Sequence, residues 1–233
     1  RAAASVFQRA QVPYVVAYAI HPDITLAGDY MFRVSAMGEV QGRGGAKLIQ
    51  NLGKKNVVLV TLKNDFGQAL AAGFKEAAPK LGVNIINEYE YGMPDRQFGP
   101  LVSKIKADNP EVIYASGYFF TAGPLVSQIR AAGITVPIIG QEGYDSDKFI
   151  EIAGAASEGT LITTSLDRDS DAPATKAFLA DYRKATNEGA DMVAAASYTA
   201  TKVLIEGLTK TGGKGGAALR DAIAAGTYDM PIG

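Results

Sequence analysis

The chain of 233 residues contains no cysteine and only one histidine. Without cysteine, the protein has no disulfide bond, no thiolate nucleophile and no cysteine-ligated metal site. The single histidine, His21, has no serine or cysteine nucleophile elbow beside it, so a histidine-assisted nucleophilic site cannot be assembled. We therefore expect His21 to be an ordinary loop residue before Pro22, and we expect neither catalytic residues nor a metal centre.

The sequence also lacks an excess of charge of one sign and lacks long apolar runs. Its 23 basic and 24 acidic residues almost cancel, which argues against nucleic acid or an anionic membrane as a partner. No apolar stretch reaches the roughly 18 residues of a membrane span. The first ten residues have no signal-peptide organisation, so the chain is either cytosolic or has already lost its signal.

What the sequence does contain is a repeated alternation of short apolar strands with amphipathic helices. This alternation predicts an α/β fold with a mostly parallel sheet. In the stretch 66–81, for example, Leu70, Phe74, Ala78 and Leu81 mark one buried helix face. The expected strands are Pro13–Val16, Asn56–Leu62, Val83–Tyr89, Val112–Ala115, Val136–Ile139 and Gly159–Thr163.

The distribution of these strands predicts two lobes. Residues 38–165 contain five strands and form one complete doubly wound lobe. Residues 1–37 supply a helix and one or two strands, and residues 166–233 supply mostly helices. Neither flank has enough strands for a sheet of its own, so we expect both flanks to form a first lobe that is incomplete in this chain. Hinge crossings are expected near Ala36–Gly38 and Ser165–Asp167, with a third beginning at Pro231–Gly233.

Three local patterns imitate ligand-binding motifs without meeting their requirements. Gly42, Gly44 and Gly45 lie inside a helical pattern, so close helix packing explains them better than a dinucleotide site does. The turn Gly212–Gly216 has no preceding strand and no serine or threonine after its lysine, which favours a helix connection over a phosphate loop. The acidic residues at 167, 169 and 171 lack the glycine and distal glutamate of a calcium loop and favour a solvated loop.

Polar and aromatic residues follow three expected strands, in the groups Asn64–Gly67, Ser116–Phe120 and Gln141–Tyr144. Open α/β sheets bind ligands at the carboxyl ends of their strands, so we expect these groups at one edge of the complete lobe. A Glu142 carboxylate among Phe66, Tyr118 and Tyr144 would be costly to desolvate unless a cation such as a ligand ammonium pairs with it. The residues alone equally allow a solvated Glu142 and aromatic side chains that merely cap the sheet.

In order and spacing, several short stretches resemble the periplasmic leucine/isoleucine/valine-binding protein family, the type I solute-binding proteins of ABC importers. The stretches, which extend over essentially the whole chain, are Val12–Val16, His21–Thr25, Phe32–Val34, Asn64–Gly67, Asn109–Tyr114, Gly117–Tyr118, Ala131–Ile134, Gly140–Gly143 and Ala156–Gly159.

The resemblance implies two Rossmann-like lobes joined by a hinge, with the ligand held between them. It implies that Tyr118 and Glu142 bind the ligand's α-ammonium and that Phe66 lines the cleft. The carboxylate-binding loop of the first lobe matches Ala17–Ile20, where Ile20 replaces the expected hydroxyl side chain and leaves backbone groups of Tyr18 and Ile20. The family's serine ligand has no counterpart here, because the resemblance implies that the N-terminal part and the C-terminal end of a family member are missing.

We therefore expect an extracytoplasmic receptor of an ABC importer that captures an amino acid or a related small molecule by hinge closure. Phe66 and Tyr144 would shape the pocket. The resemblance further implies a periplasmic location with the signal peptide absent from this chain, an ABC permease as partner, a monomeric state and no cofactor. The alternative is a ligand-sensing domain of a regulator or receptor for amides or aromatic acids. An enzyme is disfavoured, although Glu142 and Asp65 could act as a carboxylate pair if they lay about 5–9 Å apart around a sugar.

Overall fold

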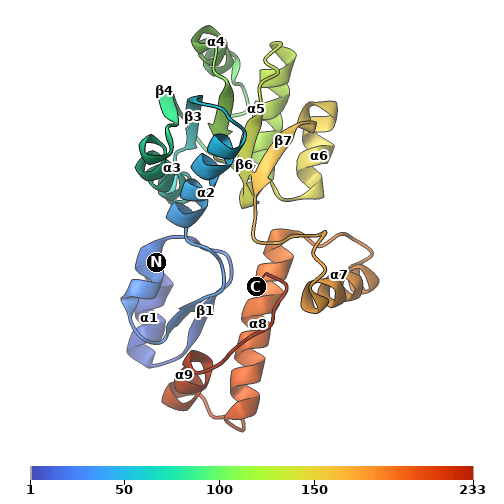
Figure 1. Ribbon diagram of the computed structural model, residues 1–233. Coiled ribbons are helices and arrows are strands. Elements are labelled where there is room, and N and C mark those ends of the chain that lie inside the picture. Colours follow the sequence, from blue (N-terminus) through green and yellow to red (C-terminus); the bar gives the residue numbers. More distant parts are fainter. Residues whose placement is uncertain (1, 233) are drawn as a thin grey trace. The chain divides into compact units, whose positions relative to one another are not determined.

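The computed structural model describes residues 2–232, which divide into two compact units (Figure 1). The first unit comprises residues 2–36 and 165–232, and the second comprises residues 37–164. The lobes expected from the sequence have boundaries within one residue of these units. The hinge between them remains a proposal. Gly233, which belongs to the expected third crossing, lies outside the described residues. Within residues 2–232, no helix combines the length and the apolar character needed to cross a bilayer.

The second unit is a doubly wound α/β layer structure, as predicted. Its five parallel strands have the spatial order β4-β3-β5-β6-β7. These strands are β3 (Asn56–Leu62), β4 (Asn84–Tyr91), β5 (Val112–Ala115), β6 (Ile138–Gln141) and β7 (Thr160–Thr163). The helices are α2 (Gly38–Asn51), α3 (Asp65–Ala77), α4 (Gly99–Asp108), α5 (Phe119–Ala131) and α6 (Asp147–Ala153), with short 3-10 turns η2 (Pro79–Leu81), η3 (Glu142–Tyr144) and η4 (Gly154–Ser157).

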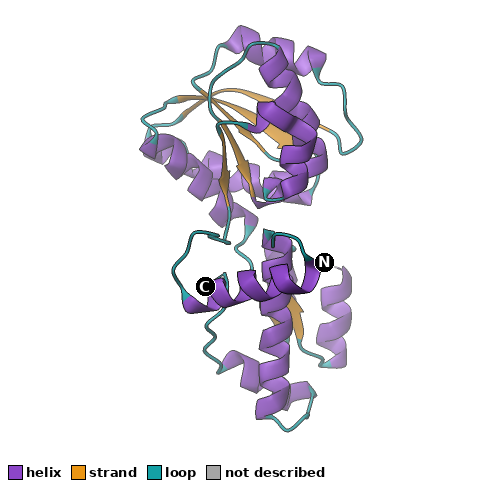
Figure 2. Ribbon diagram, turned by 90° about the vertical axis from the view of Figure 1, so that its right-hand side faces the viewer, coloured by secondary structure: helices purple, strands orange, loops and turns teal. Residues whose placement is uncertain are grey.

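The two faces of this sheet carry separate hydrophobic cores. Val57 and Leu59 of β3 point to the face covered by α2 and α3, whereas Val58 and Val60 point to the face covered by α4, α5 and α6. The alternation follows from the two-residue side-chain period of a strand. Because both faces are covered, the central strands read as continuous apolar runs, and Figure 2 shows this sheet between its helices.

One predicted strand was placed too early. The sequence assigned Val136–Ile139, whereas β6 is Ile138–Gln141. Arg130 holds the segment before the strand in a loop, because its Nη1 donates to the carbonyls of Ile134 and Val136, each at 2.8 Å. Gln141 is therefore a fully buried strand residue rather than a loop residue, and its Nε2 donates to the carbonyl of Ala115 at 3.2 Å.

The first unit contains one short parallel pair and several helices, as predicted for the two flanks. Strands β1 (Tyr14–Val16) and β2 (Met31–Arg33) pair in parallel. The helices are α1 (Ala2–Ala10), the 3-10 turn η1 (Pro22–Ala27), α7 (Pro173–Thr186), α8 (Met192–Lys210) and α9 (Gly216–Ala224). Its apolar residues form three small clusters instead of one continuous core.

The glycines of α2 serve helix packing, as the sequence indicated. A Cβ on Gly42 would lie 2.1 Å from the carbonyl oxygen of Leu70 in α3, and one on Gly45 would lie 2.2 Å from the Tyr114 ring in β5. Gly44, by contrast, faces open space. Helix α2 can therefore lie against α3 and the sheet only because residues 42 and 45 lack side chains.

The loop interpretations also match the structure. His21 caps η1, its Nδ1 accepting a hydrogen bond from the Asp23 backbone N–H at 3.3 Å. The turn Gly212–Gly216 joins α8 to α9, so a helix precedes it where a phosphate loop requires a strand. Asp171 forms an ion pair with Lys176 at 2.5 Å.

Candidate functional site

The three polar groups lie at one edge of the second unit, because they follow the parallel and adjacent strands β3, β5 and β6. Asn64 caps α3, its Oδ1 accepting from the Gly67 N–H at 2.8 Å. Tyr118 caps α5, and its N–H donates to Thr121 Oγ1 at 3.1 Å. Glu142 begins η3 directly after β6. Each of these residues thus lies at the start of the element that follows its strand.

Glycine residues allow two of these loops to approach each other closely. A Cβ on Gly143 would lie 2.2 Å from the Gly117 carbonyl oxygen and 3.3 Å from Cδ1 of Tyr118. A Cβ on Gly117 would lie 2.5 Å from the Tyr91 hydroxyl. The turn after β6 is therefore pressed against the loop after β5, which brings Glu142 next to Tyr118.

Glu142 is a buried carboxyl group without a close partner. The residue is only 2% exposed, and among residues 2–232 no group hydrogen-bonds to either carboxyl oxygen at ordinary geometry. The pKa of this carboxyl group is raised to about 7, chiefly by desolvation; the Gln41 side chain lowers the pKa, and charge repulsion from Asp145 raises it. An ionised carboxylate that is buried in this way destabilises the folded protein unless a cation pairs with it.

Tyr118 is half-buried beside this carboxyl group. Burial raises the pKa of its hydroxyl, the side chain of Asn64 lowers that pKa by hydrogen bonding, and Glu142 raises it. The hydroxyl of Tyr118 therefore interacts with the amide of Asn64 and with the charge of Glu142. All three strand-end groups contribute to this one polar cluster.

An aromatic stack covers the same edge. The rings of Phe66 and Tyr118 stack with centroids 4.8 Å apart, and those of Tyr118 and Phe120 stack at 5.6 Å. The guanidinium of Arg96 lies over Phe120, 5.7 Å from the ring centroid. The sequence prediction named Phe66 and Tyr118 as site residues. It placed Phe120 in the group that follows the strand but gave it no role, and it did not include Arg96.

Tyr144 has a different place from the one expected. It is 1% exposed and belongs to the core between the sheet and α5, where its ring lies 5.1 Å from that of Phe149. A Cβ on Gly140 would lie 2.5 Å from this ring. The sheet and α5 cover the ring of Tyr144, so this side chain anchors η3 to the core. The expectation that Tyr144 shapes the pocket directly is therefore corrected.

Tyr18 and Ile20 belong to the first unit, after β1. Tyr18 packs against the cluster that contains Leu166 and Met192, and Ile20 is buried. The guanidinium of Arg33 holds this loop by donating to the carbonyls of Ala19 and His21, the latter at 2.6 Å. The sequence prediction missed Arg33 as the residue that fixes the loop.

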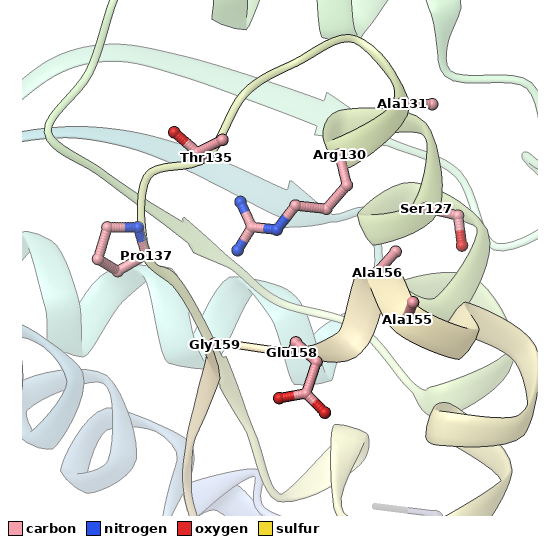
Figure 3. Close-up of a pocket in the computed structure, with 9 residues that line it drawn as sticks. All are labelled: Ser127, Arg130, Ala131, Thr135, Pro137, Ala155, Ala156, Glu158 and Gly159. Carbon is pink, nitrogen blue, oxygen red and sulfur yellow. The ribbon is translucent and has the colours of Figure 1, made fainter.

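A separate surface hollow of about 720 Å³ lies at the opposite edge of the second unit's sheet, near the start of β6 and β7 (Figure 3). None of the six predicted site residues lines it. It is lined by Ser127, Arg130, Ala131, Thr135, Pro137, Ala155, Ala156, Glu158 and Gly159. Because small side chains dominate and Arg130 is already bound to two backbone carbonyls, the hollow offers little directed chemistry.

Comparison with known proteins identifies the family of the chain. A family model described as periplasmic binding protein matches residues 1–233. The leucine-, isoleucine-, valine-, threonine- and alanine-binding protein of Pseudomonas aeruginosa is 26% identical over 233 residues, covering 99% of this chain and 62% of the relative. A Leu/Ile/Val-binding protein homologue of Brucella melitensis is 30% identical over 210 residues, covering 89% of this chain and 56% of the relative.

A solved structure extends the likeness to three dimensions. The branched-chain amino acid transporter substrate-binding protein of Streptococcus pneumoniae, in complex with isoleucine, is 26% identical with a TM-score of 0.87. The match covers 96% of this chain and 64% of that structure. The chain therefore spans less than two thirds of the length of the relatives that it matches.

Proposed function

We propose, from the premise that this chain belongs to the periplasmic binding protein family, that it is part of an extracytoplasmic receptor that captures an amino acid or a related amine. The receptor would deliver this solute to the permease of an ABC importer. Relatives are named as Leu/Ile/Val-binding proteins, and the isoleucine complex is named as a transporter component. Those names favour transport over the sensing alternative.

The observation that carries the proposal is the state of Glu142. A carboxyl group that is almost fully buried and lacks a close partner destabilises the protein when it ionises. A ligand ammonium would supply the missing positive charge and N–H donors, and the pairing would be strong because little water competes at this position. The site therefore suits a cationic group. In the unliganded protein the ionised Glu142 carboxylate lowers the stability of the fold, and binding of the cation would offset this loss.

The neighbouring groups suit the rest of such a ligand. The Tyr118 hydroxyl can accept from an ammonium or donate to a polar group beside it, and the Phe66–Tyr118–Phe120 stack can wall an apolar side chain. Backbone groups around Tyr18 and Ile20 in the first unit would bind the ligand carboxylate. Closure of the two units about the linking segments would then be stabilised by the ligand's higher affinity for the closed state.

The family is one of solute-binding proteins, and we propose that this chain has no catalytic activity. We also propose a periplasmic location and a monomeric receptor. In this scheme the small molecule and the permease are the partners. The role of each residue is binding: Glu142 pairs with the ammonium, and Tyr118 and Phe66 orient the ligand.

The test is isothermal titration of the full-length receptor with L-leucine, L-isoleucine and L-valine. The matched ligands are the corresponding branched carboxylic acids, which lack the amino group. The proposal expects binding of at least one amino acid and a large loss of affinity for its deaminated partner. If the deaminated acids bind as tightly as the amino acids, Glu142 does not recognise an ammonium. If neither series binds but aromatic acids do, the receptor role stands and the amino-acid assignment fails.

A further inference from the structure

We propose that Tyr91 is a positioning residue of the candidate site, whose hydroxyl group fixes the backbone that carries the Tyr118 side chain. The inference rests on the proposed function for the role of Tyr118 in ligand binding, whereas its geometry lies wholly within the second unit. Tyr91 is the last residue of β4 and is 3% exposed. The sequence prediction did not include it among the site residues.

The hydroxyl group of Tyr91 contacts the chain on both sides of residue 118. It donates to the carbonyl oxygen of Ser116 at 2.7 Å, and it lies 3.1 Å from Oγ1 of Thr121 in the first turn of α5. Strand β4 is not a neighbour of β5, because β3 lies between them in the sheet. One hydroxyl group therefore joins the end of β4 to the segment that follows β5.

Thr121 links this hydroxyl group to the backbone of Tyr118. The side chain of Thr121 is fully buried, and its Oγ1 accepts from the Tyr118 N–H and donates to the Tyr118 carbonyl, each at 3.1 Å. The Tyr91 proton is directed at the Ser116 carbonyl, which can only accept. The proton of Thr121 is therefore shared between the Tyr91 oxygen and the Tyr118 carbonyl. Both backbone polar groups of Tyr118 thus bond to a hydroxyl group that Tyr91 holds in place.

The surroundings of Tyr91 keep its hydroxyl group at this point. Its ring packs edge-on against the ring of Phe98, with centroids 5.4 Å apart. A Cβ on Gly117 would lie 2.5 Å from the Tyr91 oxygen and 2.9 Å from Thr121 Oγ1, so the absence of a side chain there leaves room for both hydroxyl groups. Burial raises the pKa of Tyr91 to about 12, so the hydroxyl keeps its proton at neutral pH.

The position of the Tyr118 backbone matters because of what its ring contacts. The ring stacks on Phe66 at 4.8 Å, and the hydroxyl interacts with the charge of Glu142. A tyrosine side chain occupies a small set of rotamers, so the backbone at residue 118 decides where the ring lies. Loss of the Tyr91 hydroxyl group would let this backbone move, and the Tyr118 ring would move relative to both Phe66 and Glu142.

The first experiment follows Tyr118 by NMR in the full-length receptor without ligand. Tyrosine rings are labelled with ¹³C, and the Tyr118 signals are assigned by their loss in Tyr118→Phe. The test variant is Tyr91→Phe, which removes only the hydroxyl group. The matched control is Tyr89→Phe on the same strand, whose hydroxyl donates to Asp108 Oδ2 at 2.7 Å, outside the site. We expect the Tyr118 signals to shift or broaden in Tyr91→Phe and to stay unchanged in Tyr89→Phe. Unchanged Tyr118 signals in Tyr91→Phe would overturn the proposal.

The second experiment measures L-leucine binding by calorimetry. We expect Tyr91→Phe and Thr121→Val each to weaken binding about fivefold, the size of effect that accompanies loss of one hydrogen bond, and Tyr89→Phe to bind as wild type does. Thr121→Ser, which keeps the hydroxyl group, should recover most of the affinity lost in Thr121→Val. Because Tyr91 acts through Thr121, the double variant should lose less than the two single losses combined. Equal affinities in wild type and Tyr91→Phe, or fully additive losses, would contradict the proposal.

The two proposals fail separately. If L-leucine, L-isoleucine and L-valine do not bind wild type but the Tyr118 signals move in Tyr91→Phe, the positioning role stands and the ligand assignment is wrong. If L-leucine binds and neither the signals nor the affinity changes in Tyr91→Phe, the ligand assignment stands and Tyr91 only packs. If Tyr91→Phe does not fold, Thr121→Val and Thr121→Ser provide the same comparison.

Discussion

The ring of Tyr118 stacks on the ring of Phe66 with centroids 4.8 Å apart and planes 24° apart. Tyr118 directly precedes α5 and Phe66 lies in the first turn of α3, and these helices follow the paired strands β5 and β3. The stack therefore joins two of the three strand ends at the candidate site, and it continues to Phe120. The side chains of Phe66 and Tyr118 together form a single aromatic surface beside Glu142.

The stack should affect both stability and binding. We expect Phe66→Leu and Tyr118→Leu to show a coupling free energy of about 1 kcal/mol in a double-mutant cycle of urea unfolding. Phe7 and Tyr14 in the first unit stack with the same 4.8 Å and 24° and provide the matched control. Phe66→Leu should also weaken amino-acid binding, whereas Phe7→Leu should change unfolding alone. Additive effects of the Phe66 and Tyr118 changes would show that the stack contributes nothing beyond burial.

Replacing Glu142 should separate binding from folding. Glu142→Gln keeps the shape of the side chain but leaves a ligand ammonium without its counter-charge, and we expect a loss of about 2–5 kcal/mol of binding free energy by calorimetry. Glu158→Gln, at the exposed opposite edge of the sheet, should bind as wild type does. Normal amino-acid affinity in Glu142→Gln would remove Glu142 from the site.

The unliganded protein should lose stability as the pH rises toward neutrality. The pKa of Glu142 is about 7 in the folded protein and near 4.5 when unfolded. Between these values the folded state binds more protons than the unfolded state, so the free energy of unfolding falls as pH rises. The fall should reach about 3 kcal/mol above pH 7 and be absent below the unfolded pKa.

Urea unfolding at several pH values measures this effect. In Glu142→Gln the corresponding decline should disappear, and the variant should be more stable than wild type at alkaline pH. Parallel stability profiles for the two proteins would show that Glu142 is not desolvated. Saturating amino acid should remove part of the decline in wild type, because the ammonium binds the ionised form.

Two glycines on one helix should respond to alanine in opposite ways. In Gly42→Ala the new methyl group would collide with the Leu70 carbonyl and force α2 away from α3, so we expect a destabilisation of about 2 kcal/mol or more. Gly44→Ala points into open space and should stabilise the protein by about 0.5–1 kcal/mol through helix propensity. Urea unfolding of both variants gives the comparison, and a stable Gly42→Ala would contradict the close packing of α2.

Much of the fold was predictable because its determinants are local. The apolar runs Asn56–Leu62 and Val112–Ala115 were assigned with the bounds that the structure has. The packing role of Gly42 and Gly45 was also predicted, since glycine inside an amphipathic helix indicates a close approach. The strand at 138–141 was misplaced, because the hydrogen bonds of Arg130 to Ile134 and Val136, which hold the preceding segment in a loop, leave no mark in the apolar pattern.

The sequence by itself determined the order of strands and helices, and with it the edge at which Phe66, Tyr118 and Glu142 gather, because parallel strands present their carboxyl ends together. Only the tertiary structure decided what each residue does there. It buried Tyr144 in the core, and it buried the Glu142 carboxyl group with no hydrogen-bond partner of ordinary geometry among residues 2–232. The desolvation of Glu142 depends on atoms from several separate elements, so no local sequence pattern predicts how deeply its carboxyl group is buried.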